Sequence, residues 1–130
     1  MASRFASGTE IKRVRGLGSA RSGVGHWWLQ RVTAVANVLL LIWFLASLLL
    51  LPSLDHASVV AWIAQPIVTV PLVLLILTTF WHLRMGVQVM IEDYVHSEGA
   101  KMLCLVALTF YTIATGAIAL FSVLKIALGA

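Results

Sequence analysis

The fold is decided by an uncharged stretch that runs from Val32 to Leu51 and reads VTAVANVLLLIWFLASLLLL. A helix of about 20 residues rises about 30 Å, which is the thickness of the hydrocarbon core of a bilayer. Across all 130 residues, 61% are hydrophobic and 11% are charged, whereas a soluble domain usually carries about 25% charged residues. The sequence therefore predicts an integral membrane protein with no room for a separate catalytic domain.

The residues after this stretch predict a turn and a short surface segment. Ser53 or Asp55 is suited to cap an interfacial helix that ends at Gln65. Proline is favoured in a first helical turn, so Pro66 predicts the start of the next long helix.

The expected fold is all-α, with three transmembrane helices that pack with a second membrane anchor protein. The spans are predicted over 32–51, 67–91 and 102–126. Ser97 followed by Glu98 is typical of the start of the third helix. Span three is rich in small residues, which let neighbouring helices approach closely in a membrane.

Positive charge is concentrated before span one. Because Lys and Arg next to a span stay in the cytoplasm, residues 1–26 are predicted to form a cytoplasmic tail and residues 27–130 the membrane domain. The net charge of +4 then reflects membrane topology, and no nucleic-acid partner is expected. An organelle transit peptide is the alternative for this Ser- and Arg-rich start. Six of the nine Lys and Arg lie at or before residue 31: Arg4, Lys12, Arg13, Arg15, Arg21 and Arg31.

Two ionisable side chains, His82 and Arg84, lie inside span two. Such residues are expensive in a membrane and are candidates for function. If Asp93 marks the cytoplasmic edge, His82 lies roughly 16 Å deeper, near the bilayer midplane. At 100° per residue, Gly86, Val89 and Asp93 follow His82 on one helical face. One stripe therefore connects the midplane with the cytoplasmic surface.

A neutral imidazole that faces a helix bundle is a usual ligand of b-type haem, and a glycine one turn away leaves space for the macrocycle. The alternative is that His82 only hydrogen-bonds a neighbouring helix. His26 and His96 are expected at the cytoplasmic surface and His56 at the outer one, so none reaches the midplane. A second axial ligand must then come from another chain, which places the haem at a subunit interface.

Other polar residues have candidate roles at the cytoplasmic side. Arg31 and His26 are placed to contact haem propionates, or alternatively to anchor the span by their charge. Arg84 lies about 200° around the helix from His82, so structural pairing or snorkelling is favoured for it. Tyr94 can hydrogen-bond a quinone carbonyl, and Asp93 can orient donors or relay protons. An ordinary membrane-belt tyrosine at a helix end is the alternative.

Taken together, Arg31-Val-Thr33-Ala34 and His82-x3-Gly86-x6-Asp93-Tyr94 resemble the small hydrophobic membrane anchor subunits of succinate dehydrogenase, in their alphaproteobacterial form. The resemblance covers the whole chain, including its three spans and basic start. It implies residence in a bacterial inner membrane, with the mitochondrial inner membrane as the alternative.

The resemblance also implies a set of site residues and partners. His82 would ligate haem b, with the second histidine supplied by the companion anchor protein, the cytochrome b anchor subunit. Tyr94, with Asp93 beside it, would bind ubiquinone, and Arg31 would lie near the haem propionates. His26 stands one place away from the family's upstream histidine. FAD and iron–sulfur clusters would reside on the flavoprotein and iron–sulfur subunits, so this chain alone performs no dehydrogenation.

Two rival interpretations stay open at this point. The anchor of a fumarate reductase uses the same architecture with the electron flow reversed. A non-redox transporter or assembly protein would use His82 and Arg84 as a polar seam between helices, and its complex would be colourless.

Overall fold

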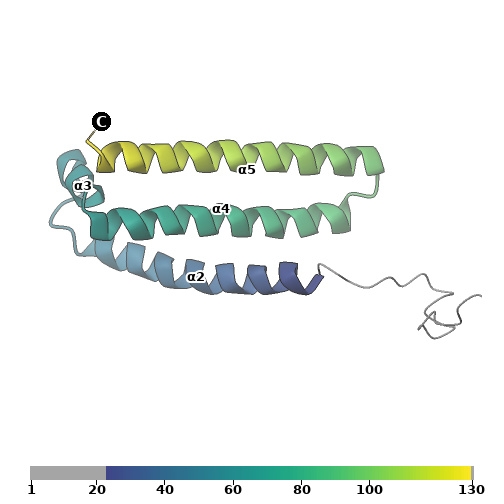
Figure 1. Ribbon diagram of the computed structural model, residues 1–130, viewed down its shortest axis with the longest axis horizontal. Coiled ribbons are helices and arrows are strands. Elements are labelled where there is room, and N and C mark those ends of the chain that lie inside the picture. Colours follow the sequence, from purple (N-terminus) through teal and green to yellow (C-terminus); the bar gives the residue numbers. More distant parts are fainter. Residues whose placement is uncertain (1–22, 130) are drawn as a thin grey trace, which may run out of the picture.

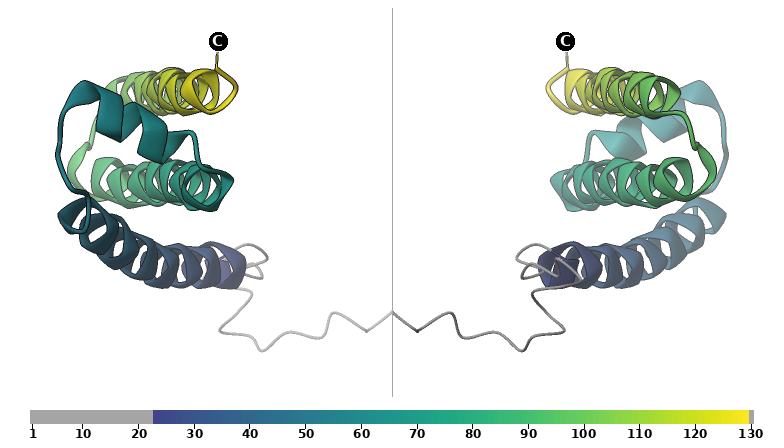
Figure 2. Two further views of the ribbon diagram at one scale, coloured as in Figure 1. Left: turned by 90° about the vertical axis from the view of Figure 1, so that its left-hand side faces the viewer. Right: turned by 90° about the vertical axis from the view of Figure 1, so that its right-hand side faces the viewer.

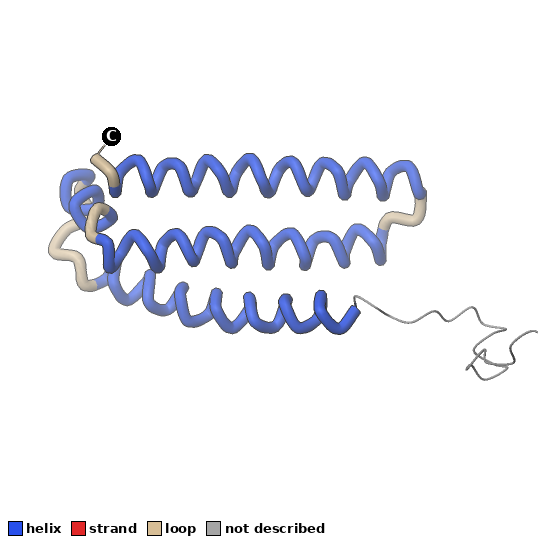
Figure 3. The backbone as a smooth tube through the Cα atoms, in the orientation of Figure 1, coloured by secondary structure: helices blue, strands red, loops and turns tan. Residues whose placement is uncertain are grey.

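The computed structural model describes residues 23–129, which form helices joined by short loops, with no strand in that range (Figure 3). The helices are α2 (Gly23–Leu49), α3 (His56–Ile63), α4 (Pro66–Tyr94) and α5 (Glu98–Ala127) (Figure 1). Three of them, α2, α4 and α5, are long and apolar enough to cross a membrane. The predicted all-α fold with three spans is therefore confirmed. Outside the described residues lie the tail cations Arg4, Lys12, Arg13, Arg15 and Arg21.

Each long helix begins before the segment expected to cross the hydrocarbon, and α4 and α5 also end after it, whereas α2 ends at Leu49, short of the predicted end at Leu51. The first begins at Gly23 and the second continues to Tyr94, while the third begins at Glu98. A helix the length of α4, 29 residues, rises roughly 44 Å, compared with about 30 Å for a hydrocarbon core. The helix ends are therefore long enough to stand among the lipid headgroups.

The predicted helix starts are confirmed. Asp55 is the N-cap of α3, and its carboxylate accepts a hydrogen bond from the backbone N–H of Ser58 at 3.2 Å. Pro66 occupies the first turn of α4, where its missing N–H leaves no bond unmade. Ser97 is the N-cap residue of α5 but makes no capping side-chain bond, and Glu98 instead pairs with Lys101 at 3.9 Å.

The three long helices form a curved row. Helix α4 lies in the middle and packs against α2 on one side and α5 on the other, whereas α2 and α5 do not touch each other within the described range. The end-on views show the row, which is not closed into a triangle (Figure 2). Within the described residues, α4 therefore has two covered sides, which carry the interfaces described below, and two sides that are uncovered except where α3 contacts one end of α4.

A small apolar core joins the three long helices near α3, at the end of the bundle where α2 ends and α4 begins. The indole of Trp62 in α3 stacks on Trp43 of α2, with ring centroids 6.5 Å apart. The ring of Phe44 lies tilted against the same indole, with a distance of 6.1 Å between ring centroids. Val68 and Leu72 of α4 are buried in this cluster, and residues of α2, α3 and α5 pack around it. The short helix α3 thus holds the three long helices together at one end.

Most large apolar side chains elsewhere are exposed. Leu49 is 85% exposed and Phe110 is 71% exposed, and the only buried hydrophobic residue of the described chain outside the end cluster is Met85. A surface this apolar is stable only against lipid tails or other protein. The chain therefore presents most of its surface to a bilayer or to further subunits.

Candidate functional site

His82 lies close to the middle of α4. The helix runs from Pro66 to Tyr94, so its halfway point is residue 80, and His82 is about 3 Å from that level along the axis. The imidazole is half-buried and faces α2. His82 is therefore a central residue of this helix.

A hydrogen bond joins His82 to Thr33 on the neighbouring helix. The hydroxyl oxygen of Thr33 lies 3.1 Å from Nδ1 of His82. Thr33 is 7% exposed and is the only buried residue of α2. Nε2 of His82 makes no hydrogen bond to any described residue. One ring nitrogen is therefore engaged inside the chain while the other is left available.

The hydroxyl of Thr33 also contacts two carbonyl oxygens of its own helix. The distances are 2.9 Å to Leu29 and 3.1 Å to Gln30. A hydroxyl has one proton and two lone pairs, whereas a carbonyl oxygen can only accept. If the proton points to these carbonyls, the oxygen of Thr33 accepts from Nδ1–H of His82. Nε2 then carries the lone pair that a metal ligand needs.

A second hydrogen bond crosses the same interface one turn away. The hydroxyl of Thr79 in α4 donates to the side-chain carbonyl of Asn37 in α2 at 3.3 Å. Both bonds were missed by sequence reasoning, which assigned no role to Thr33, Asn37 or Thr79. The sequence did contain a signal for the bond between Thr33 and His82, because the two residues lie at similar distances from the predicted cytoplasmic ends of their helices.

The face of α4 beside His82 is open. A Cβ built on Gly86, one turn toward the cytoplasmic end, meets no other atom within 4 Å. Met85, next to Gly86 in sequence, is 6% exposed. Space for a flat group therefore exists beside the imidazole without movement of the chain.

Asp93 and Tyr94 end α4 at the predicted cytoplasmic rim. Tyr94 is the last residue of the helix and is 77% exposed, and Asp93 is exposed as well. One turn earlier, the side-chain amide of Gln88 donates to the carboxylate of Glu92 at 2.8 Å. The phenol and the carboxylate are thus exposed to a substrate or another protein, and residues 23–129 do not enclose them.

The two proposed propionate contacts lie on different sides of α2. The guanidinium of Arg31 sits over the ring of Trp27 at 5.5 Å, which is a cation–π contact. Nε2 of His26 is buried and has no hydrogen-bond partner among the described residues. At 100° per residue, His26 shares the face of Thr33, whereas Arg31 lies about 160° from that face. The structure therefore does not bring Arg31 and His26 together.

Arg84 lies on the other side of α4, in a groove of about 360 Å³ against α5. The groove is apolar apart from Arg84 and Thr112. Phe80 lies over Gly116, where an added Cβ would come within 3.4 Å of the ring. The prediction that small residues allow close helix approach is confirmed at Gly116. Arg84 thus belongs to a different interface from His82.

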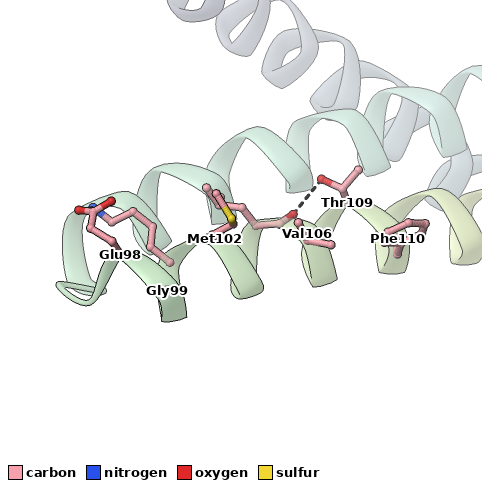
Figure 4. Close-up of a pocket in the computed structure, with 8 residues that line it drawn as sticks. Glu98, Gly99, Met102, Val106, Thr109 and Phe110 are labelled. Atoms are coloured by element: carbon pink, nitrogen blue, oxygen red, sulfur yellow. Dashed lines mark hydrogen bonds and ion pairs between the residues drawn. The ribbon is translucent and has the colours of Figure 1, made fainter.

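A second hollow, of about 590 Å³, lies along the first half of α5 (Figure 4). All of its lining residues belong to α5, from Glu98 to Phe110, and the hydroxyl of Thr109 bonds only to the carbonyl of Leu105, at 2.9 Å. It is an open strip of helix surface. No group of three or more His, Cys, Asp and Glu is clustered between residues 23 and 129.

Comparisons with known proteins define the class to which this architecture belongs. Residues 6–116 match the family described as succinate dehydrogenase/fumarate reductase transmembrane subunit. The chain is 35% identical over 106 residues to the succinate dehydrogenase hydrophobic membrane anchor subunit of Rickettsia bellii, covering 82% of this chain and 85% of that protein.

More distant relatives carry similar names. The corresponding protein of Rickettsia conorii is 29% identical over 107 residues, covering 82% of this chain and 85% of the relative. The succinate dehydrogenase membrane anchor subunit of Reclinomonas americana is 29% identical over 85 residues, covering 63% and 71%. No solved structure gives a significant match.

The three apolar spans and these relatives define a multi-pass helical protein of a bacterial inner membrane. The chain belongs to the family of succinate dehydrogenase/fumarate reductase transmembrane subunits.

Proposed function

We propose that this chain is the membrane anchor subunit of a succinate:ubiquinone oxidoreductase. It shares a haem b with a companion anchor protein and forms part of the ubiquinone-reduction site. Flavoprotein and iron–sulfur subunits carry the FAD and the clusters, and this chain attaches them to the membrane. The names of its relatives, which are succinate dehydrogenase anchors, support this direction of electron flow.

One observation carries the haem assignment. His82 is held by Thr33 through Nδ1 at 3.1 Å, so Nε2 is left to bind iron. A hydrogen bond on the second ring nitrogen is the usual companion of a metal-ligating histidine. The alternative of a merely structural histidine accounts for the bond to Thr33 but gives no use to Nε2 at the level of the bilayer midplane. The residues present therefore fit a b-type haem.

Other side chains complete the fit on this side of the haem. When bound, haem supplies a one-electron carrier near the quinone. Gly86 leaves open space beside the imidazole. The buried, unpartnered Nε2 of His26 lies on the face of α2 that Thr33 occupies, so His26 is better oriented than Arg31 toward a propionate. Arg31 supplies positive charge at the same end of α2.

Tyr94 and Asp93 provide this chain's part of the quinone site. The phenol of Tyr94 donates a hydrogen bond to a ubiquinone carbonyl, which favours the build-up of negative charge on that oxygen. The carboxylate of Asp93 orients donors and passes protons from the cytoplasm during the two-electron, two-proton reduction. Because both side chains are exposed among the described residues, we expect other subunits to close the pocket.

The haem assignment is tested by a reduced-minus-oxidised optical spectrum of the purified complex. His82→Ala should lose the b-type signal. His96→Ala is the matched control, because His96 lies exposed in the loop after α4, and its complex should keep the wild-type spectrum. An unchanged b-type signal in His82→Ala would remove His82 as a ligand.

A further inference from the structure

We infer that Thr33 is a positioning residue for His82: its hydroxyl holds Nδ1–H, presents Nε2 to the iron and thereby lowers the reduction potential of the haem. This inference rests on the proposed haem function. It assigns to α2 a role in tuning the cofactor that α4 ligates.

Thr33 differs from the other buried threonines of the described chain. The hydroxyls of Thr69 and Thr112 bond only to backbone carbonyls, which is how a buried threonine commonly satisfies its hydroxyl. Thr33 also contacts backbone carbonyls and in addition reaches a side chain of another helix, 49 residues away in sequence. The oxygen of Thr33 therefore makes a contact between helices that is not needed to satisfy its own hydroxyl.

The geometry determines which proton arrangement favours metal binding. With the hydroxyl proton donated to the carbonyls of Leu29 and Gln30, the oxygen of Thr33 can only accept from His82, and Nδ1 of His82 must be the protonated nitrogen. If the hydroxyl instead donated to Nδ1, the proton of the neutral ring would sit on Nε2 and block the ligand position. The two carbonyls next to Thr33 thus select the ligating tautomer.

The same bond affects the iron. An acceptor on Nδ1–H makes the imidazole a more basic ligand. A more basic ligand stabilises ferric iron relative to ferrous iron, so the reduction potential falls. Without the acceptor, the N–H is left unpaired in an apolar interface, the ring loses a fixed orientation, and the potential rises.

The test is a redox titration of the haem in the purified complex with three variants. Thr33→Val removes the hydroxyl and keeps the shape, whereas Thr33→Ser keeps the hydroxyl. Thr79→Val is the matched control, because it removes the other hydrogen bond between α2 and α4 without touching His82.

We expect Thr33→Val to weaken the preference for ferric iron about tenfold, a shift of about 59 mV to more positive potential for one electron. Thr33→Ser and Thr79→Val should keep the wild-type potential. Loss of haem in Thr33→Val alone, with both other variants loaded, would also support the role of Thr33.

A wild-type potential in fully loaded Thr33→Val overturns the inference, and so does an equal shift in Thr33→Val and Thr79→Val, because that would reflect general packing of the two helices. A wild-type complex without a b-type signal, or one whose signal survives in His82→Ala, contradicts the proposed function and removes the inference with it.

Discussion

The two interfaces of the central helix differ in chemistry. Against α2, helix α4 makes hydrogen bonds between side chains, from His82 to Thr33 and from Thr79 to Asn37. Against α5 it packs apolar surface closely, with Phe80 over Gly116, and no side-chain hydrogen bond joins those two helices in the described chain.

The difference indicates which interface serves only to pack the helices together and which has a further role. The α4–α5 interface demonstrates that small and aromatic residues suffice to join two spans, as expected where lipid offers no hydrophobic driving force between helices. A hydrogen bond between membrane helices contributes only about 0.6 kcal/mol on average. The hydrogen bond of the buried Thr33 to His82 is therefore better explained by the proposed role of the imidazole than by helix association.

The largest effect is expected at the end of α4, beyond both interfaces. Tyr94→Phe removes only the phenolic hydroxyl of an exposed residue, so helix packing should be unchanged. Loss of a hydrogen bond that strengthens in the transition state should lower ubiquinone reductase activity by about 10- to 100-fold. Succinate oxidation with an artificial soluble acceptor, assayed on the same preparation, should stay near wild type.

If Tyr94→Phe instead lowered both activities together, Tyr94 would not be a quinone residue or the soluble subunits would have dissociated. Retention of those subunits on a sizing column decides between the two causes, and the first would contradict the site.

A smaller effect is expected at the α4–α5 interface. Gly116→Leu places a large side chain where even a Cβ reaches Phe80 at 3.4 Å, so overpacking should destabilise the protein by about 1–3 kcal/mol. The melting temperature of the detergent-purified complex would measure this, with Gly116→Ala as a milder matched variant. Haem potential should stay at the wild-type value in both variants.

The contrast between the two interfaces would be broken if Gly116→Leu shifted the haem potential as Thr33→Val is expected to do. An unchanged melting temperature in Gly116→Leu would show that α4 and α5 can separate there without loss.

The smallest effect is expected at α3, outside both interfaces. Ser58 donates to the carboxylate of Asp55 from its side chain and from its backbone N–H, which holds the pKa of Asp55 below the usual value of 3.8. A lowered pKa in the folded state means that the ionised carboxylate stabilises the fold above about pH 3.8, and that this contribution is lost as the pH falls through the folded-state pKa.

Asp55→Ala should therefore lower the melting temperature slightly at pH 7, and the difference from wild type should shrink on acidification below about pH 3.8. Thermal melts at several pH values would check this. If the difference in melting temperature between Asp55→Ala and wild type grew on acidification, the role of Asp55 as an N-cap would be contradicted.

The spans and helix starts were predictable because their signals are local. A charge-free run of 20 residues from Val32 to Leu51 has few alternatives to a membrane helix. Pro66 and Asp55 act within one turn of their own positions, and both begin helices as predicted. The position of His82 near the middle of a long helix was likewise predictable, because it follows from counting residues along a single helix.

The partner of His82 could not be read in the same way. Thr33 meets it across 49 residues of sequence, and that meeting depends on the rotation and register of α2 against α4. At 100° per residue, His26, Thr33 and Asn37 fall on one face of α2, but the sequence does not determine how that face is rotated and registered against α4. The curved row, in which α2 and α5 do not contact each other within the described residues, likewise depends on packing at Trp62 between residues that are distant in sequence.

The most direct test of the central claim is an experimental map of the assembled complex at a resolution that defines side chains. We predict iron at bonding distance from Nε2 of His82, a second axial ligand from another chain, and the hydroxyl of Thr33 on Nδ1. An imidazole that lies against lipid or a neighbouring helix, with no iron in reach, would contradict this prediction.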